Sequence, residues 1–409
     1  MSSRTSLIIA FVLLIPIVAA AQELESFAGV RLTFDRAGAR SLAMGSTAIA
    51  STDPNAVTAN PAAIAGSART LSIETRRRTF EGRYIGDHDL NTIGVESATS
   101  GIRSATFTLP IAATTWSFFY DEPLDVQHSN ASLFSAGAVD ATFFVCDGRV
   151  SATPCNSPAV ALQLPATFPL DVALRLRRYG AAAAWSRGPL AFGASLRREH
   201  LRQQSGFVAA PPLFNAFSGI AETTDDTAMT WSAGATWNVA RSARVGASYS
   251  SGGSFSGTRT FPVEPAQSIE LRTPPSLGVG VSISPLPRLT LAADAVRVRY
   301  SAMMHDRRNV FPQGSDLGFP DVTELHAGAE YRIGSVALRG GWWRDPAHAL
   351  AIRNGVTPPP PFHFLPALVD SSENHLTAGI GFGGKTRFDA SIDRGERSTR
   401  VALEISTSF

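Results

Sequence analysis

Most of this 409-residue chain consists of short runs in which apolar and polar residues alternate. In the run 231–238, tryptophan and alanine alternate with serine, glycine, threonine and asparagine, and runs 189–202 and 385–394 behave alike. A period of two residues is that of a β-strand with one apolar and one polar face. This alternation constrains the chain more than any other feature, and it predicts an all-β fold.

The connections between these runs alternate in length. Fourteen runs can be placed, and short connections near 187–188, 240–241, 285–287, 334 and 383–384 separate long ones at 122–170, 203–227, 301–321 and 347–374. An even number of strands, with short turns at one end and long loops at the other, is the pattern of transmembrane barrels whose apolar face meets lipid. A soluble β-sandwich is the competing interpretation. The connection lengths favour a 14-stranded antiparallel transmembrane β-barrel over residues 68–409.

Both ends of the chain indicate export to the bacterial outer membrane. Arg4, an apolar run over 6–18 and three alanines before Gln22 predict a cleaved signal peptide at 1–21. That run is short for the ~30 Å of a hydrocarbon core. The last run alternates and ends on Phe409, which resembles the terminal signal of outer-membrane barrels. Both mature termini are then expected in the periplasm.

Composition and scattered reactive residues exclude several function classes. Charged residues make up 17% of the chain and the net charge is +2, so no nucleic-acid partner is expected. The eight histidines show no metal-binding spacing, and no nucleophile motif occurs, so we expect no enzyme activity, metal or cofactor. Cys146 and Cys155 are predicted to form a loop disulfide, in preference to free thiols or a metal site.

One segment, 38–65, breaks the strand pattern. It is rich in small residues and fits neither an amphipathic helix nor an alternating strand. Irregular backbone at membrane depth is tolerated only where protein surrounds it. We therefore predict that residues 22–67 form a hatch inside the lumen, either a static plug or a movable gate.

The same segment resembles the opening of the FadL-type outer-membrane transporters of hydrophobic compounds. Segments 272–281 and 338–346 are also similar to that family, so the resemblance covers essentially the whole mature chain. The chain departs from the family at Ser46, where a second glycine is usual, and at 58–59, where an aromatic residue is usual. The matching hatch residues are Gly38, Arg40, Ser41, Met44, Gly45, Asp53, Asn60, Pro61 and Ala62.

The resemblance implies passive uptake of long-chain fatty acids or other hydrophobic small molecules, gated by the hatch. Such a protein would be a monomer surrounded by outer-membrane lipid. The alternative is a structural or assembly barrel without transport, resembling the PorV-type partners of a secretion machine.

Two sets of residues are candidates for ligand contact. Apolar clusters on two long loops could form a groove, or could pack on each other to cap the barrel. A carboxylate ligand would want arginine, for which Arg40, Arg197 and Arg297 are available, although each is more simply a lumen charge paired with an acid. The groove candidates are Phe207, Phe214, Phe217, Phe362 and Phe364.

One run, 289–300, changes phase. Its apolar residues occupy one face up to Ala293 and the other face from Val296 onward. A β-bulge between these two residues would reconcile the faces and turn Asp294 toward the lumen.

Overall fold

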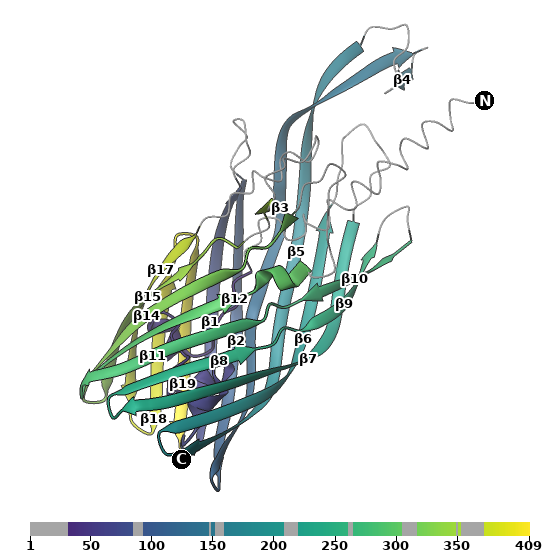
Figure 1. The fold of residues 1–409 in the computed structure, drawn as a ribbon. Helices are drawn as coiled ribbons and strands as arrows, with labels where there is room; N and C mark the ends of the chain where they lie inside the picture. Colours follow the sequence, from purple (N-terminus) through teal and green to yellow (C-terminus); the bar gives the residue numbers. More distant parts are fainter. Residues whose placement is uncertain are drawn as a thin grey trace.

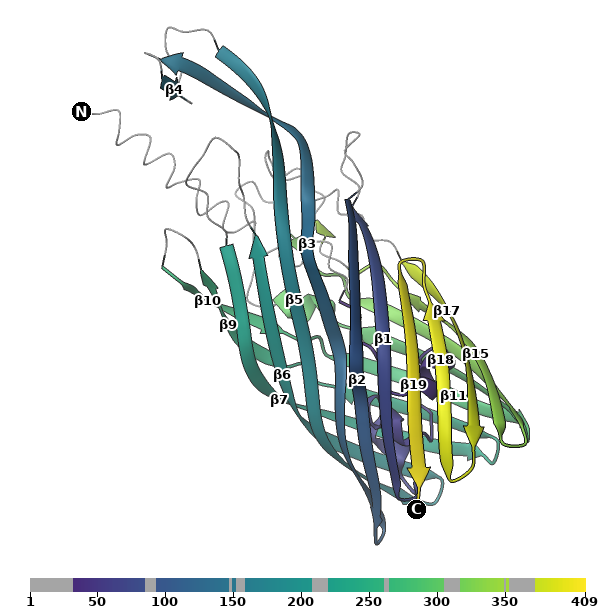
Figure 2. The ribbon, with the colours of Figure 1, turned by 180° about the vertical axis from the view of Figure 1, so that it is seen from behind.

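The computed structural model describes residues 32–84, 93–146, 149–151, 159–207, 220–260, 265–304, 317–348, 351–352 and 372–409. They form one closed antiparallel barrel (Figures 1 and 2). The ring closes at β1 (Thr70–Tyr84), which pairs with both β2 (Ile93–Ile111) and β19 (Ser398–Ser408).

Fourteen strand positions surround the barrel, as the sequence predicts, and we call each position a stave whether one strand or two successive strands fill it. Two staves are each built from two strands: β9 continues β8, since both pair with β7, and β10 with β11 forms the next stave. The other strands, in chain order, are β3 (Thr114–Cys146), β4 (Arg149–Ser151), β5 (Ala159–Arg187), β6 (Leu190–Phe207), β7 (Ile220–Ala240), β8 (Ala243–Ser250), β9 (Ser254–Thr260), β10 (Gln267–Arg272), β11 (Ser276–Leu286), β12 (Leu289–Val298), β14 (Val322–Ile333), β15 (Val336–Asp345), β17 (Glu373–Gly383) and β18 (Thr386–Arg394). A separate pair, β13 (Leu317–Gly318) and β16 (Ala351–Ile352), lies outside this sheet.

Six connections of two residues each gather at one end of the barrel, which we call the short-turn end. They lie at 112–113, 188–189, 241–242, 287–288, 334–335 and 384–385. The chain also ends there, where the Phe409 N–H donates to the Arg69 carbonyl over 3.1 Å. Two-residue hairpins need unusual backbone angles, and Gly188 and Gly334 provide them at φ 61° and 58°.

One predicted loop is largely strand. The connection expected over 122–170 is replaced by continuations of β3 and β5, which pair as far as Phe144 and Ala159. Figures 1 and 2 show this hairpin extending beyond the neighbouring strands. The sequence pattern missed it because alternation marks a strand only where its two faces meet different surroundings.

The barrel is apolar outside and polar inside. On β19, Val401, Leu403 and Ile405 are 42–57% exposed, whereas Ala402 and Glu404 between them are buried. A soluble sandwich would bury its apolar face instead, so the outer surface is suited to lipid. Within the described residues, no helix combines the length and the apolar character needed to cross a membrane.

The phase change in β12 has another cause than the expected bulge. β12 pairs with β14 without a register shift from Leu289 to Val298, so the predicted bulge is wrong. Asp294 does face the lumen, and so do Val296 and Val298, each less than 10% exposed. The apolar residues change face because this end of the strand borders a part of the lumen that Phe34, Leu176 and Tyr300 also line.

Candidate functional site

The N-terminal segment, defined here as residues 32–67, lies inside the barrel (Figures 1 and 2). It contains one short helix, α2 (Ala39–Ala43), and two 3₁₀ turns, η1 (Pro54–Thr58) and η2 (Pro61–Ile64). A further 3₁₀ turn, η3 (Tyr300–Met304), follows β12. Ala39, Val57 and Ile64 are completely buried. The lumen at this level is therefore filled with protein, as irregular backbone at membrane depth requires.

Acidic side chains from the closing strands hold the start of α2. The N–H of Gly38 donates to Glu74 over 2.7 Å, and the N–H of Ala39 donates to Glu404 over 2.7 Å. The other oxygen of Glu404 accepts from the amide of Asn55 over 2.6 Å. Two carboxylates from β1 and β19 thus bind two parts of the segment at once.

Arg40 belongs to an ion-pair network and is not free for a ligand. Its Nε donates to Glu330 over 2.7 Å, and its Nη1 lies 3.6 Å from Asp53. Asp53 also pairs with Arg387 at 3.1 Å, and Glu330 accepts from Arg339 over 2.8 Å. These contacts therefore support a structural role for Arg40, as a lumen charge that is paired with acidic side chains.

Gly45 makes a close backbone contact with the barrel wall, and Ser46 follows it in the same turn of the segment. A Cβ on Gly45 would lie 2.4 Å from the Ala327 carbonyl oxygen, so only glycine fits there. Gly45 has φ 66° and Ser46 has φ 61°, and both are left-handed conformations. The resemblance expects glycine at both positions, and the backbone explains why. Nearby, Met44 is buried and Ser41 donates to the Thr47 carbonyl over 2.9 Å.

The Asn60-Pro61-Ala62 motif starts η2 and packs on glycines of the wall. Asn60 accepts from the Ala62 N–H over 3.0 Å and donates to the Ile49 carbonyl over 2.6 Å. A Cβ on Gly234 would lie 1.9 Å from the Asn60 oxygen. Sequence reasoning missed this partner. Its signal was a glycine on the polar face of the run 231–238.

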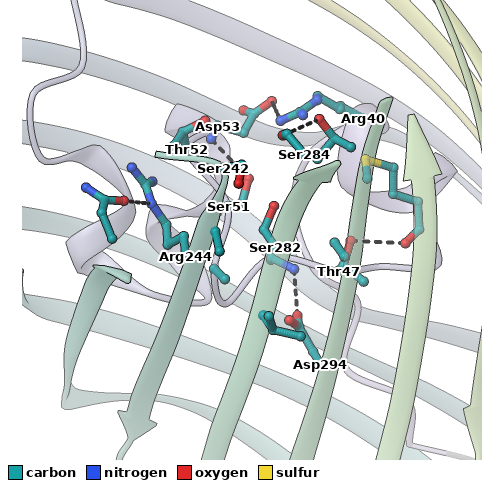
Figure 3. A pocket seen from close by; sticks show the side chains of 18 of the residues that line it. Arg40, Thr47, Ser51, Thr52, Asp53, Ser242, Arg244, Ser282, Ser284 and Asp294 are labelled. Carbon is teal, nitrogen blue, oxygen red and sulfur yellow. Dashed lines mark hydrogen bonds and ion pairs between the residues drawn. The ribbon is translucent and has the colours of Figure 1, made fainter. Parts of the chain in front are cut away.

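Two cavities flank the segment. The inner cavity, of about 110 Å³, lies toward the long-loop end, and the vestibule, of about 360 Å³, lies toward the short-turn end (Figure 3). Residues between 44 and 53 line one or the other, so this stretch separates them. The larger apolar side chains that line the inner cavity are those of Phe34, Ile49, Leu176, Val296, Val298 and Tyr300, and its charged lining residues are Asp35, Arg36, Arg178, Glu199 and Glu324.

Among the described residues, Arg197 is buried beside the inner cavity without an acidic hydrogen-bond partner, although the charges of Glu199, which lines that cavity, and Asp121 act on it. Its Nη2 donates to the Trp231 carbonyl over 3.1 Å and to Ser250 over 2.8 Å, and Ser250 lines the cavity. Within the described residues, its Nε and Nη1 have no hydrogen-bond partner, although the residue is 1% exposed. Arg297, by contrast, is exposed on the outer face and donates to Thr323, so its expected lumen position is wrong.

The barrel wall has a break in pairing between β2 and β3. Their ladder ends at Ser104 and Asp121, although both strands continue toward the long-loop end. Arg103 occupies the break and pairs with Glu122 and, at 2.9 Å, with Asp125. A lateral passage would therefore have to displace an ion-pair cluster.

Asp35 joins the segment to this region through arginines of the wall. Its N–H donates to the Pro123 carbonyl over 2.8 Å, and its carboxylate pairs with Arg400 at 3.0 Å and Arg76 at 3.3 Å. Burial alone would raise the pKa of Asp35, but Arg400, then Arg78 and Arg76, lower it to about 2. Asp35 is therefore charged at neutral pH.

Several predicted site residues have no described side chain. Of the groove candidates, Phe214, Phe217, Phe362 and Phe364 lie outside the described residues, as does Cys155. The side chains of Phe207 and Cys146, which end β6 and β3, are likewise not described.

Neither protein-family models nor curated proteins match this sequence. Solved structures do match its fold. The Ralstonia pickettii toluene transporter TbuX is 16% identical, with 92% of this chain and 99% of that chain covered at a TM-score of 0.58. A Pseudomonas aeruginosa FadL homologue is 13% identical, with 93% and 98% covered at 0.65. The P. putida toluene transporter TodX is 13% identical, with 92% and 99% covered at 0.61.

Identities this low establish fold alone, and the coverage shows that the shared fold extends over nearly the whole chain. The resemblance predicted from residues 38–62 is thereby confirmed at the level of architecture. The chain has the fold of the FadL-type transporters.

Proposed function

We propose that this protein is an outer-membrane channel for the passive uptake of hydrophobic small molecules. The apolar outer surface supports a location in lipid, with the short-turn end and both mature termini in the periplasm. The fold it shares with toluene transporters supports a hydrophobic ligand. In this orientation the ligand enters from the long loops and reaches the inner cavity before the N-terminal segment.

The observation that carries the ligand class is the position of Arg197. A buried guanidinium without an acidic hydrogen-bond partner costs several kcal/mol, which Glu199 and Asp121 offset in part through charge and a directly bound carboxylate would offset further. Its neighbour Ser250 opens onto a cavity whose lining combines apolar side chains with charged and hydroxyl groups. This combination suits an amphipathic acid, with its carboxylate toward Arg197 and its tail along Val298 and Tyr300. Long-chain fatty acids have this chemistry, whereas toluene has no group for Arg197.

Gating by the N-terminal segment follows from the separation of the two cavities. A space of about 110 Å³ holds only a few water volumes, at about 30 Å³ each, and cannot hold a long alkyl chain. Uptake therefore requires either movement of residues 44–53 or passage through the break between β2 and β3. In the first route the ligand enters the periplasm, and in the second it enters the membrane.

The test compares ligand binding and uptake across four proteins. Cells that lack their own fatty-acid channel express one of these proteins: wild type, a deletion of 38–65, Arg197→Gln or the outer-face control Arg297→Gln. Uptake of dodecanoate, dodecanol and toluene is measured, together with calorimetric binding to the purified proteins.

We expect wild type to bind and transport dodecanoate, and Arg197→Gln to weaken its binding about tenfold or more. Arg297→Gln should behave as wild type, and the deletion should raise uptake. Retained toluene uptake with no dodecanoate binding would overturn the fatty-acid assignment alone. If no ligand binds or crosses in any form, the transport function itself is wrong.

A structural barrel without transport is the second candidate. The ion pairs that join Arg40, Asp53 and Arg387 fasten the segment to the wall from several sides. Such fastening suits a static plug. The same uptake panel separates the two functions, because a scaffold would remain closed to every ligand.

A further inference from the structure

The vestibule at the short-turn end has its own chemistry (Figure 3). It lies between the N-terminal segment and the ends of β8, β11 and β12, and at about 360 Å³ it is the larger of the two cavities described above. Exposed turn residues such as Arg241 and Arg288 belong to its lining, so it opens at this end of the barrel.

The two acidic residues that line the vestibule, Asp294 and Asp53, already have hydrogen-bond and ion-pair partners. Asp294 accepts from the N–H groups of Ala48 and Ile49 at 2.7 and 3.0 Å, and pairs with Arg36 at 3.2 Å. Asp53 is bound by arginines of the ion-pair network. Neither carboxylate is left to neutralise another cation in the vestibule.

Three lining arginines have no acidic partner within the part of the chain that the structure describes. Arg244 donates to the neutral amide of Asn238 over 2.7 Å. Arg241 and Arg288, on the neighbouring turns, make no side-chain ion pair there. The vestibule therefore has excess positive charge that its own wall does not neutralise.

Hydroxyl groups adjoin these arginines. Ser282 is the direct register partner of Arg244 across β8 and β11, and Ser242 follows Arg241 in the turn. Figure 3 shows Arg244 and Ser282 on adjacent strands, with Ser242 of the turn beside the same opening. Guanidinium and hydroxyl donors together match the acceptor oxygens of a carboxylate or a phosphate.

We propose that this vestibule is an oxyanion-binding site. Arg244 and Ser282 hold the anion, while Arg241 and Arg288 supply charge at its rim. The site takes carboxylates or phosphates, whose planar or tetrahedral oxygens suit a guanidinium fork. It lies on the opposite side of the segment from Arg197 and shares no residue with that site. Its existence does not depend on transport.

The experiment titrates the full-length protein in a non-ionic detergent with inorganic phosphate, octanoate and octanol. Calorimetry measures binding to wild type, Arg244→Gln, Ser282→Ala and the control Arg187→Gln. Arg187 is an exposed arginine at the end of β5, next to another short turn, and it does not line the vestibule. The far-ultraviolet spectrum of each variant verifies that the barrel is folded.

We expect phosphate and octanoate to bind wild type saturably and octanol not to bind this site. Arg244→Gln should weaken anion binding about tenfold, and Ser282→Ala severalfold, since charged hydrogen bonds are the stronger ones. Arg187→Gln should bind as wild type. Equal weakening by Arg187→Gln would mean diffuse surface charge, and absent anion binding would equally overturn the proposal.

A lipid headgroup and a soluble anion share this chemistry, and a second arm distinguishes them. Wild type and Arg244→Gln are placed in nanodiscs of phosphatidylcholine alone or with phosphatidylglycerol. If lipid is the source, phosphatidylglycerol should abolish octanoate binding to wild type, whereas unchanged binding identifies a soluble anion. Toluene uptake by Arg244→Gln reports on transport separately, so a failed anion site leaves the proposed channel function untouched.

Discussion

Glu404 on the last strand accepts a hydrogen bond from the backbone N–H of Ala39, which lies 365 positions earlier in the chain. The second oxygen of Glu404 accepts from Asn55. One carboxylate on the closing strand therefore ties α2 and η1 to the wall, and the segment can be fully seated only when the barrel has closed.

Replacing Glu404 with glutamine should loosen the segment without opening the barrel. The amide presents only one acceptor oxygen, so one of the donors is left unsatisfied, at a cost of about 1–3 kcal/mol. Amide hydrogen exchange over 38–58 should accelerate, with unchanged exchange in the strands. Glu396→Gln, at an exposed position between β18 and β19, is the matched control. Unchanged protection of the segment in E404Q would contradict this role.

Gly45→Ala should prevent the segment from seating. The new methyl group would meet the Ala327 carbonyl at 2.4 Å, and backbone atoms on both sides cannot yield. Gly66→Ala separates the clash from backbone strain, because Gly66 also has positive φ but has no atom within 4 Å of its Cβ position. The folded yield in detergent should fall sharply for G45A and only slightly for G66A. Equal yields would contradict the clash.

Ser46→Gly should stabilise the protein by about 0.5–1 kcal/mol, because the left-handed backbone costs an L-residue roughly 1–2 kcal/mol and part of this gain is lost to chain entropy. The Ser46 backbone has φ 61°. Ser46→Ala keeps the strain and should leave stability near that of wild type. Urea unfolding in detergent measures all three proteins. A destabilised S46G would show that the serine side chain outweighs the strain.

Asp35 should stabilise the protein in a pH-dependent way. Its pKa is lowered from 3.8 to about 2, so its contribution is complete above about pH 4 and is lost as the pH falls through 2. Asp35→Asn should therefore destabilise the protein by about 2–3 kcal/mol at neutral pH. Thermal unfolding of both proteins at pH 2 to 7 should show the difference shrinking only at the acid end. A difference that is constant with pH would argue against a charge effect.

The sequence alone was sufficient for the barrel. Alternation of period two marks strand faces wherever one face meets lipid and the other the lumen, and two-residue turns are local, so fourteen staves could be placed. The same reasoning failed where surroundings change along a strand. In β12 the apolar residues turn inward at Val296 because a cavity lies there, and the β3–β5 hairpin continues where alternation no longer marks it.

The site depended on tertiary structure. Residues 38–62 identified the segment, because glycine, proline and asparagine report local backbone needs. The partners of these residues are glycines and carboxylates far away in the chain, such as Gly234 and Glu404, whose roles exist only after closure. The sequence was equally unable to show that Arg40 is ion-paired, that Arg197 hydrogen-bonds to neutral groups and that Arg297 faces outward. Charge pairing depends on distances across the lumen, and only the closed barrel sets those distances.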